Sequence, residues 1–469
     1  MTKIDSGLSN ADRFLHVPFD ADILNKPRAR AVSSPADSHH TSAAHAGDND
    51  AENTALAKSS PAVDELLGDF YGTYPWPWQP TTFSYINDPR LEAAMVNQDI
   101  GDWKHNRLTE NSAIWVAGCG TNQALHTALK FPLGTVIGSD VSSPSLDLAR
   151  ANAGKLGIAN LTLRQESINQ VGYQEQFDYI ISTGVIHHNA DPKATLERLS
   201  LALKPGGILE LMVYNRCHRL LNTSFQKAIR IFGEHEKTLN FESDFLLART
   251  LANNFPVRNQ MSGLLAETRT APDAEFADLL IHPLEHSYTV ESLEVLAANC
   301  GLEILMPCIS TYGKFKSPTI DWNLHFENRE LQNAYDAMPD TRRWQVSNLL
   351  LYEQSPLLWF YLQRVDSGRS RKSEQQICNE FLSRSFKKSA AKQATYIRNE
   401  DVWALAPQAV PYPLEQPDAA VDEIYRLADP DNAMGRIFKY LGIEPTFQAV
   451  NRARVKLTTS SFPYLKAVK

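Results

Sequence analysis

Three side chains that can exchange a proton follow two predicted strands of the chain. His187 and His188 come after the strand that begins at Phe177, and Tyr214 ends the strand Ile208–Tyr214. Histidine takes up a proton near neutral pH, so either imidazole could act as a general base in a group transfer. His187 is favoured because it comes first after its strand, and the alternative is that one of the pair only hydrogen-bonds a loop carbonyl. Tyr214 lies on the same rim, so these three residues are the candidate catalytic groups.

A glycine turn lies between a short apolar run and a predicted helix. The run Ile114–Ala117 leads into Gly118 and Gly120, and the helix begins at Gln123. Glycine puts no side chain in the way of a ligand, so such a turn brings backbone N–H groups and a helix N-terminus close to it. A dinucleotide fingerprint would need a third glycine where Gln123 stands. A nucleoside ligand without a pyrophosphate therefore fits this turn better than NAD.

A carboxylate closes the next predicted strand, Thr135–Asp140. Asp140 lies 22 positions after Gly118 (140 − 118), about where a doubly wound sheet places the acid that holds ribose hydroxyls. One ionised carboxylate can accept hydrogen bonds from both hydroxyls. Further strands, such as Leu161–Arg164, alternate with helices such as Pro192–Leu203. This alternation predicts an α/β fold with a parallel sheet and right-handed crossovers.

Four motifs, in this order, resemble those of the class I S-adenosylmethionine-dependent methyltransferases over roughly residues 109–215. They are Ala117-Gly118-Cys119-Gly120-Thr121, Asp140 closing strand two, Val185-Ile186-His187-His188, and Leu203-Lys204-Pro205-Gly206-Gly207. The resemblance implies a Rossmann-like seven-stranded methyltransferase sheet with helical insertions. It also implies S-adenosyl-L-methionine as the cofactor and methylation as the reaction. Strand six is expected at Leu302–Met306 and strand seven at Leu357–Arg364.

The resemblance also implies which residues hold the methyl donor. The glycine turn would wrap the methionine portion, Asp140 would hold the ribose, and Val141 would pack on the adenine. The full set is Val116, Ala117, Gly118, Cys119, Gly120, Asn122, Asp140, Val141, Glu166, Ser167, Ser182, Thr183 and Gly184. Two positions depart from the family's pattern, because Val116 replaces a common acidic residue and Asn122 replaces a glycine. Asp99, Asp102 or water could supply the missing partner for the ammonium group of the donor.

Aromatic and polar residues around this core are candidates for the site of the methyl acceptor. The segment from Phe70 to Pro80 holds five aromatic residues and three prolines, so it is stiff and costs little entropy to order. It is either a strap over the sheet edge or a lid that walls the pocket, and both remain open. The candidate substrate-binding residues are Tyr71, Tyr74, Trp76, Arg216, His286 and Tyr288. Arg216 could hold a carboxylate or phosphate of the acceptor, or it could lie at the surface.

The length of 469 residues indicates more than one domain. We expect a disordered or loosely packed tail over residues 1–60, a lid or strap over 61–108, and the donor-binding core over 109–215. A helical cap insertion follows over 216–288, with helices expected at Leu220–Phe232, Ser243–Asn253 and Ala274–Ile281. The end of the core, with a second insertion, occupies 289–365, and a small C-terminal domain of unknown role occupies 370–469.

The composition of the chain bears on whether it binds nucleic acid, metal ions or membranes. The net charge of −8 does not favour nucleic acid. The five cysteines are scattered without a Cys-x-x-Cys pair, which argues against a metal site and suits a reducing compartment. No apolar run reaches the ~18 residues of a membrane span, and Met1–Ser6 lacks the apolar core of a secretory signal. These features predict a cytoplasmic protein without metal or membrane partners.

The sequence therefore predicts a methyltransferase that acts on an O or N atom of a small-molecule or peptide-borne acceptor. One alternative is an RNA methyltransferase whose basic stretch over residues 366–400 contacts phosphates. The other is a scaffold that binds the donor without transferring its methyl group, an alternative that Val116 and Asn122 keep open. The sequence does not determine the oligomeric state.

Overall fold

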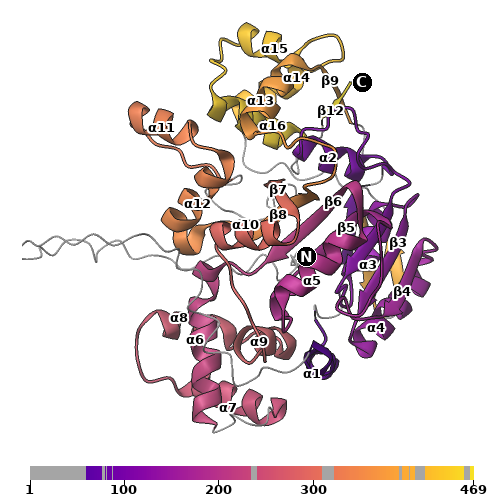
Figure 1. Cartoon of the computed structure of the whole chain (residues 1–469), viewed down its shortest axis with the longest axis vertical. Coiled ribbons are helices and arrows are strands. Elements are labelled where there is room, and N and C mark those ends of the chain that lie inside the picture. The colour runs from indigo at the N-terminus through magenta and orange to yellow at the C-terminus, as the bar shows by residue number, and fades with distance from the viewer. Residues whose placement is uncertain are drawn as a thin grey trace, which may run out of the picture.

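The computed structural model describes residues 60–76, 80, 82–86, 88–233, 240–308, 322–389, 393–400, 402–406, 418–458 and 465–468. The tail expected over residues 1–60 lies outside the described residues, apart from Ser60. A seven-stranded sheet forms the centre of the molecule. In Figure 1 the helices of the cap lie below this sheet and the C-terminal helices lie above it.

The central sheet has the strand order β4-β3-β2-β5-β6-β8-β7. Its parallel strands are β2 (Ala113–Ala117), β3 (Thr135–Asp140), β4 (Leu161–Gln165), β5 (Phe177–Thr183) and β6 (Leu203–Val213). Strand β8 (Leu358–Arg364) lies between β6 and β7 (Leu302–Pro307) and runs antiparallel to both. The predicted Rossmann-like seven-stranded sheet is confirmed, including strands six and seven.

Local signals in the sequence fix the ends of the crossover helices, which are α3 (Gln123–Lys130), α4 (Ser143–Leu156), α5 (Pro192–Ala202) and α10 (Val290–Asn299). Asp191 accepts a hydrogen bond from the backbone of Ala194 and so caps α5. Thr289 and Ser292 form a capping box at the start of α10. Gly157 ends α4 with φ of +66°, a conformation that glycine adopts without strain.

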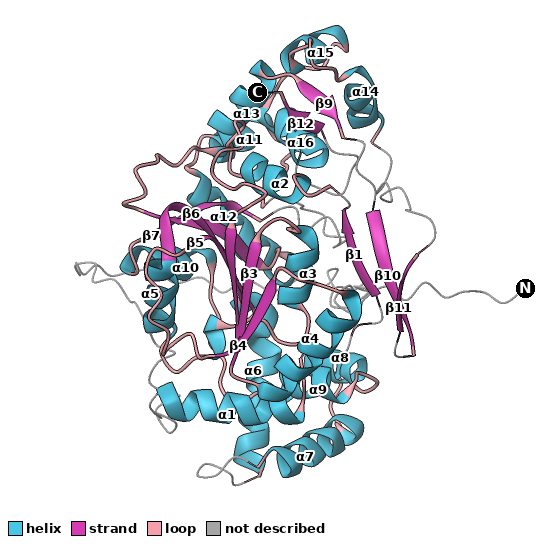
Figure 2. Cartoon of the chain, turned by 90° about the vertical axis from the view of Figure 1, so that its right-hand side faces the viewer, coloured by secondary structure: helices cyan, strands magenta, loops and turns pink. Residues whose placement is uncertain are grey.

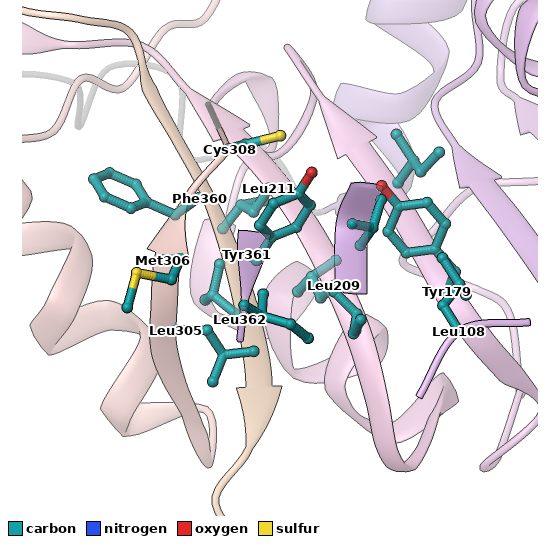
Figure 3. Packing of buried hydrophobic residues seen from close by; sticks show 14 of the residues in the cluster. Leu108, Tyr179, Leu209, Leu211, Leu305, Met306, Cys308, Phe360, Tyr361 and Leu362 are labelled. Carbon is teal, nitrogen blue, oxygen red and sulfur yellow. The ribbon is translucent and has the colours of Figure 1, made fainter. Parts of the chain in front are cut away.

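A dry apolar core fills the space between the sheet and its helices. Figure 3 shows Phe360 and Tyr361 of β8 packed beside Leu209 and Leu211 of β6 and Met306 of β7. Each of these side chains is almost completely buried, and burial of one such side chain contributes about 1.5–3 kcal/mol. The faces of the sheet are mainly apolar, and the buried Glu210 of β6 is hydrogen-bonded to Tyr179 and Trp359 within it.

Four helices form the cap between β6 and α10: α6 (Arg216–Phe232), α7 (Phe241–Asn254), α8 (Gln260–Thr268) and α9 (Asp273–Leu280). The three expected helices are present, and α8 was not predicted. The cap has its own hydrophobic cluster, which includes Phe225, Phe276 and Leu280. Helix α1 (Ser60–Thr73) adds Phe70 to this cluster. The cap and the segment before the core therefore pack together, and Figure 1 shows α1 beside α9.

The second insertion carries α11 (Arg329–Asp336), α12 (Asp340–Leu351) and the short helix η6 (Tyr352–Gln354). The C-terminal region carries α13 (Glu374–Ser383), α14 (Ala419–Leu427), α15 (Met434–Tyr440) and α16 (Phe447–Thr458), with β9 (Phe386–Lys388) paired to β12 (Leu465–Ala467). Apolar residues of this region, such as Ile377 and Leu457, belong to the main hydrophobic cluster. The C-terminal region thus shares the hydrophobic core of the rest of the chain. That residues 370–469 form a separate small domain stays a prediction.

A small sheet joins the segment before the core to the C-terminal region. Strand β1 (Thr82–Ile86) pairs with β10 (Gln393–Asn399), which pairs with β11 (Val402–Leu405). Phe83 and Trp403 pack with Leu125 of α3, and the Trp403 indole N–H donates to Asn152 of α4 at 3.2 Å. Figure 2 shows this sheet beside α3 and α4. Helix α2 (Leu91–Asp99) follows β1 and also contacts α16. None of the described helices is long and apolar enough to span a membrane.

A buried ion pair between α12 and α13 gives a test of this shared core. Glu374 accepts hydrogen bonds from Arg343 at 2.6 Å and from the Trp344 indole at 3.2 Å, and both charges are almost fully buried. Glu374→Gln leaves the buried guanidinium with Asp340, 3.0 Å away, as its remaining carboxylate, so we expect the free energy of unfolding to fall by about 1–3 kcal/mol in urea titrations.

The matched control is Glu423→Gln, which removes an exposed ion pair with Arg426. Its unfolding free energy should change by less than about 0.5 kcal/mol. A similar small change for Glu374→Gln would contradict a structural role for the buried pair.

Candidate functional site

The glycine turn after β2 is held against the end of β3. The N–H groups of Gly118 and Cys119 both donate to the carbonyl of Ser139, at 2.8 and 2.9 Å. Gly118 has φ of +73°, and a Cβ there would lie 2.5 Å from the side chain of Val185. Both the conformation and the close approach require glycine at this position. The turn is therefore fixed beside the loop that follows β5.

Asp140 receives two backbone hydrogen bonds at the end of β3. Gly120 N–H donates to one carboxylate oxygen at 2.8 Å, and Ser142 N–H donates to the other at 2.9 Å. Burial raises the pKa of Asp140, and these N–H groups act in the opposite direction. A carboxylate oxygen has more than one lone pair, so each oxygen keeps capacity for a further donor. Asp140 can therefore accept two ligand hydroxyls without losing its contacts to the turn.

A pocket of about 600 Å³ lies next to Asp140, between α1 and the end of β4. Val141, Glu166, Ser167 and Tyr173 line it, together with Asp64 of α1. The Ser167 hydroxyl donates to Asp64 at 2.6 Å, and the Tyr173 hydroxyl donates to Glu166 at the same distance. Polar groups and Val141 thus surround a space of the size that small ligands occupy.

The remaining predicted donor residues surround the end of β5. Gly184 has φ of +77°, and Ser182 is fully buried. The Thr183 hydroxyl accepts a hydrogen bond from Gln123 at 2.5 Å. Asn122 precedes α3 as its N-cap residue, without a capping hydrogen bond from its side chain. Val116, Ala117 and Cys119 are buried, so their side chains belong to the core. The backbone of Val116 and Ala117 leads directly into the glycine turn.

The predicted catalytic residues form one cluster with side chains from α1 and the cap. His187 and His188 lie in the short helix η4 (Ile186–His188), and the His187 ring stacks on Tyr214 with centroids 3.9 Å apart. The Tyr214 hydroxyl donates to Asp278 of α9 at 3.1 Å, and the Tyr71 hydroxyl donates to the same carboxylate at 3.2 Å. The sheet edge, the cap and α1 therefore meet at Asp278.

Burial keeps both histidines of this cluster neutral. His187 is 0% exposed, and burial, with His188 as the second cause, lowers the pKa of His187 well below its usual value. Burial also lowers the pKa of His188, which Asp278 and Glu285 partly oppose. His188 Nδ1 lies 2.8 Å from the carbonyl of Leu284, and a carbonyl only accepts, so Nδ1 carries the proton. The Nε2 atom of His188 then has no hydrogen-bond partner among the described residues.

Other predicted acceptor residues lie around this cluster. The Tyr74 ring stacks on Phe245 of α7 inside the cap cluster. The Trp76 carbonyl accepts from the N–H of Thr121, so the aromatic segment passes over the glycine turn. Arg216 is exposed, with its side chain near the carbonyl of Ser287 at 3.4 Å. Of the predicted acceptor residues, the structure brings Tyr71 into the cluster and leaves Arg216 at the surface.

The segment that carries His286 and Tyr288 extends the edge of the sheet. The Tyr288 N–H donates to Tyr214 at 2.8 Å, and its carbonyl accepts from Arg216 at 2.7 Å. The His286 N–H donates to the carbonyl of His187 at 2.8 Å. These two residues therefore fix the backbone that presents Tyr214 and His187.

Sequence reasoning missed the polar partners of these residues. Asp278 and His282 are four positions apart, a spacing that places side chains on one face of a helix, and that signal was available. Asp64 was not detectable, because its contacts with Ser167 and Asn169 join segments about a hundred residues apart. Asp102, suggested as a partner for the donor, instead accepts from the N–H groups of Asn106 and Arg107 in its own loop.

One family model and several proteins of known sequence match part of this chain. The sequence model of the family described as "Methyltransferase domain" matches residues 109–239. An uncharacterised protein of Synechococcus is 29% identical over 195 residues, covering 40% of this chain and 46% of that protein. A ubiquinone biosynthesis O-methyltransferase of Dinoroseobacter shibae is 37% identical over 82 residues, covering 18% of this chain and 33% of that protein. The chain thus matches less than half the length of either relative.

A third relative matches over a larger share of its own length, and one solved structure matches over a larger share of this chain. A trans-aconitate 2-methyltransferase of Deinococcus radiodurans is 34% identical over 154 residues, covering 31% of this chain and 55% of that protein. The solved structure of PKMT2 from Rickettsia typhi in complex with AdoHcy has a TM-score of 0.48 and 15% identity, covering 77% of this chain and 72% of that one.

The neutral state of the buried histidines can be tested by a pH titration. The pKa of His187 is lowered in the folded chain, so its ring should stay neutral when the pH falls through about 6.5, where unfolded histidine takes up a proton. The unfolded state then binds more protons than the native state, so stability falls with pH below that value. We expect nitrogen NMR spectra of the folded protein, with its histidines labelled, to show that the His187 ring stays neutral as the pH falls through that value. The variant His187→Gln identifies the signal of this ring. A ring that titrates near 6.5 in the folded protein would contradict the assignment.

Proposed function

We propose that the chain is a class I S-adenosylmethionine-dependent methyltransferase, as the match of residues 109–239 to a methyltransferase-domain family supports, and that it transfers a methyl group to an O or N atom of a small-molecule or peptide-borne acceptor. The observation that carries the proposal is that the donor residues and the cluster around Asp278 lie at the same edge of the sheet. Helix α1 joins them, because its Asp64 accepts from Ser167 beside the pocket and its Tyr71 donates to Asp278.

The residues present fit S-adenosylmethionine, the donor of this family. Asp140 keeps one unused acceptor position on each oxygen, which suits two ribose hydroxyls. The pocket beside Val141 and Ser167 supports the expected place for adenine. The positive φ values of Gly118 and Gly120 shape the turn that would wrap the methionine portion. When bound, the donor supplies an activated methyl group on a positively charged sulfur.

The cap and α1 support an acceptor site beside the donor. Tyr71 and Tyr214 are partly exposed, whereas the histidines and Asp278 behind them are buried. We propose that the acceptor contacts these two tyrosines and that the chain aligns it with the methyl group while excluding water. This arrangement favours a structural role for His187, because its ring stacks on Tyr214 and holds that side chain in place. A base role for His188 would use its unpartnered Nε2 atom.

The basic stretch over residues 366–400 gives little support to an RNA acceptor. Arg371 donates to Asp340 at 2.8 Å, Lys372 donates to the carbonyl of Gly101 at 2.8 Å, and Arg369 contacts Asn106 at 3.4 Å. These side chains tie the C-terminal region to the rest of the chain, so they are not a free phosphate-binding surface.

Donor binding is tested with Asp140→Ala and S-adenosylhomocysteine, the demethylated product. The substitution removes the acceptor of two hydroxyls, and hydrogen bonds to a charged group are worth about 1.5–3 kcal/mol each. We expect calorimetry to show affinity lowered on the order of 10²-fold or more. Asp147→Ala changes an exposed carboxylate of α4 and should leave the affinity unchanged. Equal affinity of wild type and Asp140→Ala would contradict the assignment of Asp140.

Transfer is tested with a donor that carries a labelled methyl group. Cell lysate is separated into RNA, protein and metabolite fractions, and each is incubated with the protein and the labelled donor. We expect label in the protein or metabolite fraction. Label confined to RNA would overturn the proposed acceptor class. If the product binds but no fraction is labelled, the donor-binding scaffold is the better description.

A further inference from the structure

Asp278 is the central group of the cluster, and both of its oxygens are occupied by tyrosines. Its side chain is 3% exposed, and it accepts hydrogen bonds from Tyr71 and Tyr214. Each hydroxyl proton is therefore directed at the carboxylate. The Tyr214 oxygen keeps two lone pairs and the Tyr71 oxygen, which lies 3.2 Å from His282 Nε2, keeps one, and both tyrosines are partly exposed. What these residues offer to a ligand is hydrogen-bond acceptors.

The cluster also carries a surplus negative charge. Arg219 is bonded to Glu285 through two of its nitrogens, and both side chains are buried. Arg230 donates to the carbonyl of His282 and is balanced electrostatically by Asp244 and Glu285. Burial keeps His187, His188 and His282 neutral. Two cations thus face three carboxylates among the described residues of this cluster. Of these three, Asp278 makes no ion pair among the described residues; burial raises its pKa, and the charge of Arg219 opposes that rise in part.

The same residues do not favour a metal ion, although His188, Asp278 and His282 have ligand atoms within 4.8 Å of one another. The Leu284 N–H donates to His282 Nδ1 at 3.2 Å, so in the neutral ring the proton is on Nε2. That nitrogen lies 3.2 Å from the Tyr71 hydroxyl and donates to it. A metal ligand needs a free lone pair at this atom. The geometry instead gives a hydrogen-bond chain from His282 through Tyr71 to Asp278.

We infer that the methyl acceptor is an amine, bound as an ammonium ion against the hydroxyl oxygens of Tyr71 and Tyr214, with Asp278 as the positioning residue that supplies the negative charge. The inference rests on the proposed methyl transfer. An ammonium group brings the N–H donors and the positive charge that this site lacks. A carboxylate or phosphate acceptor would meet like charge and acceptor atoms only.

The hydrogen bonds also provide a path for the proton that an ammonium must lose before it can react. One N–H proton passes to the Tyr214 oxygen while the Tyr214 hydroxyl proton passes to Asp278, so the acceptor becomes a neutral amine and the carboxylate becomes neutral. The nitrogen lone pair then forms the bond to the methyl carbon. The bond from that carbon to sulfur breaks, and its electron pair stays on sulfur. The product leaves as a methylated ammonium ion and a neutral thioether.

The test uses hexylammonium, hexanol and hexanoate as probes of equal chain length. Their affinities are measured by calorimetry on the full chain saturated with S-adenosylhomocysteine. We expect hexylammonium to bind at least about 10-fold more tightly than hexanol, and hexanoate to bind least. In Asp278→Asn the ratio of hexylammonium to hexanol affinity should fall about 10-fold, because the charge is lost and the shape is kept. Asp273→Asn, an exposed position on the same helix, should leave the ratio unchanged.

The ratio separates a positioning role from a merely structural one, because a general distortion would weaken both probes equally. If Asp278→Asn does not fold, the preference of the wild type for hexylammonium over hexanol still decides the question. Equal binding of these two probes to the wild type overturns the inference. So does binding of Zn²⁺ that is lost in Asp278→Asn. Failure to bind S-adenosylhomocysteine would instead overturn the proposed function, so the two failures are distinguishable.

Discussion

Burial of the central sheet between apolar layers is the constraint on which the rest of the structure depends. Strand β5 is buried along almost its whole length and β6 along most of it, so a polar side chain within them needs a partner inside the protein, as Glu210 has in the Tyr179 hydroxyl and the Trp359 indole. Polar groups that remain open to a ligand stand where the strands end and the backbone turns. Asp140, His187 and Tyr214 each stand at such a position, after β3, β5 and β6. The chemistry of the chain is confined to the edge where parallel strands end.

Helix α1 connects the two halves of that edge. On the donor side, Asp64 accepts from Ser167 and from Asn169. Two turns later in the same helix, Tyr71 donates to Asp278 of the cap. A single helix thus contacts the end of β4 and the acceptor cluster through polar groups. Any change in its position would alter both sides together, which gives the donor pocket and the cap a shared physical link.

The charges beneath the acceptor cluster explain its protonation states. Removing a charge from water is costly unless a partner of opposite sign is close. The Arg219–Glu285 pair meets this requirement, and the Arg219 guanidinium also lies 4.1 Å from the centre of the Tyr214 ring. The neighbouring histidines have no such carboxylate in contact, and they remain neutral. Burial raises the pKa of Asp278, and the charge of Arg219 and the hydrogen bond from Tyr214 act in the opposite direction.

The sequence by itself determined the central sheet and supplied the residues that we propose bind the donor, because both follow from local patterns. Apolar runs, the turn at Gly118 and Gly120, and a carboxylate at Asp140 all act within short segments. The helix α8 was missed, and so were β1, β10 and β11. Thr82 pairs with Ile397 across most of the chain, and no local pattern marks two short strands as partners.

Only the tertiary structure decided what the candidate catalytic residues contact. The order of residues placed His187, His188 and Tyr214 on one rim. It could not show that the imidazoles are buried, because burial depends on helices from the cap and from α1. Asp278 acquires its role only when Tyr71 and Tyr214, far apart in the sequence, converge on it. Secondary structure follows from neighbours along the chain, whereas charge, burial and hydrogen bonding at a site follow from neighbours in space.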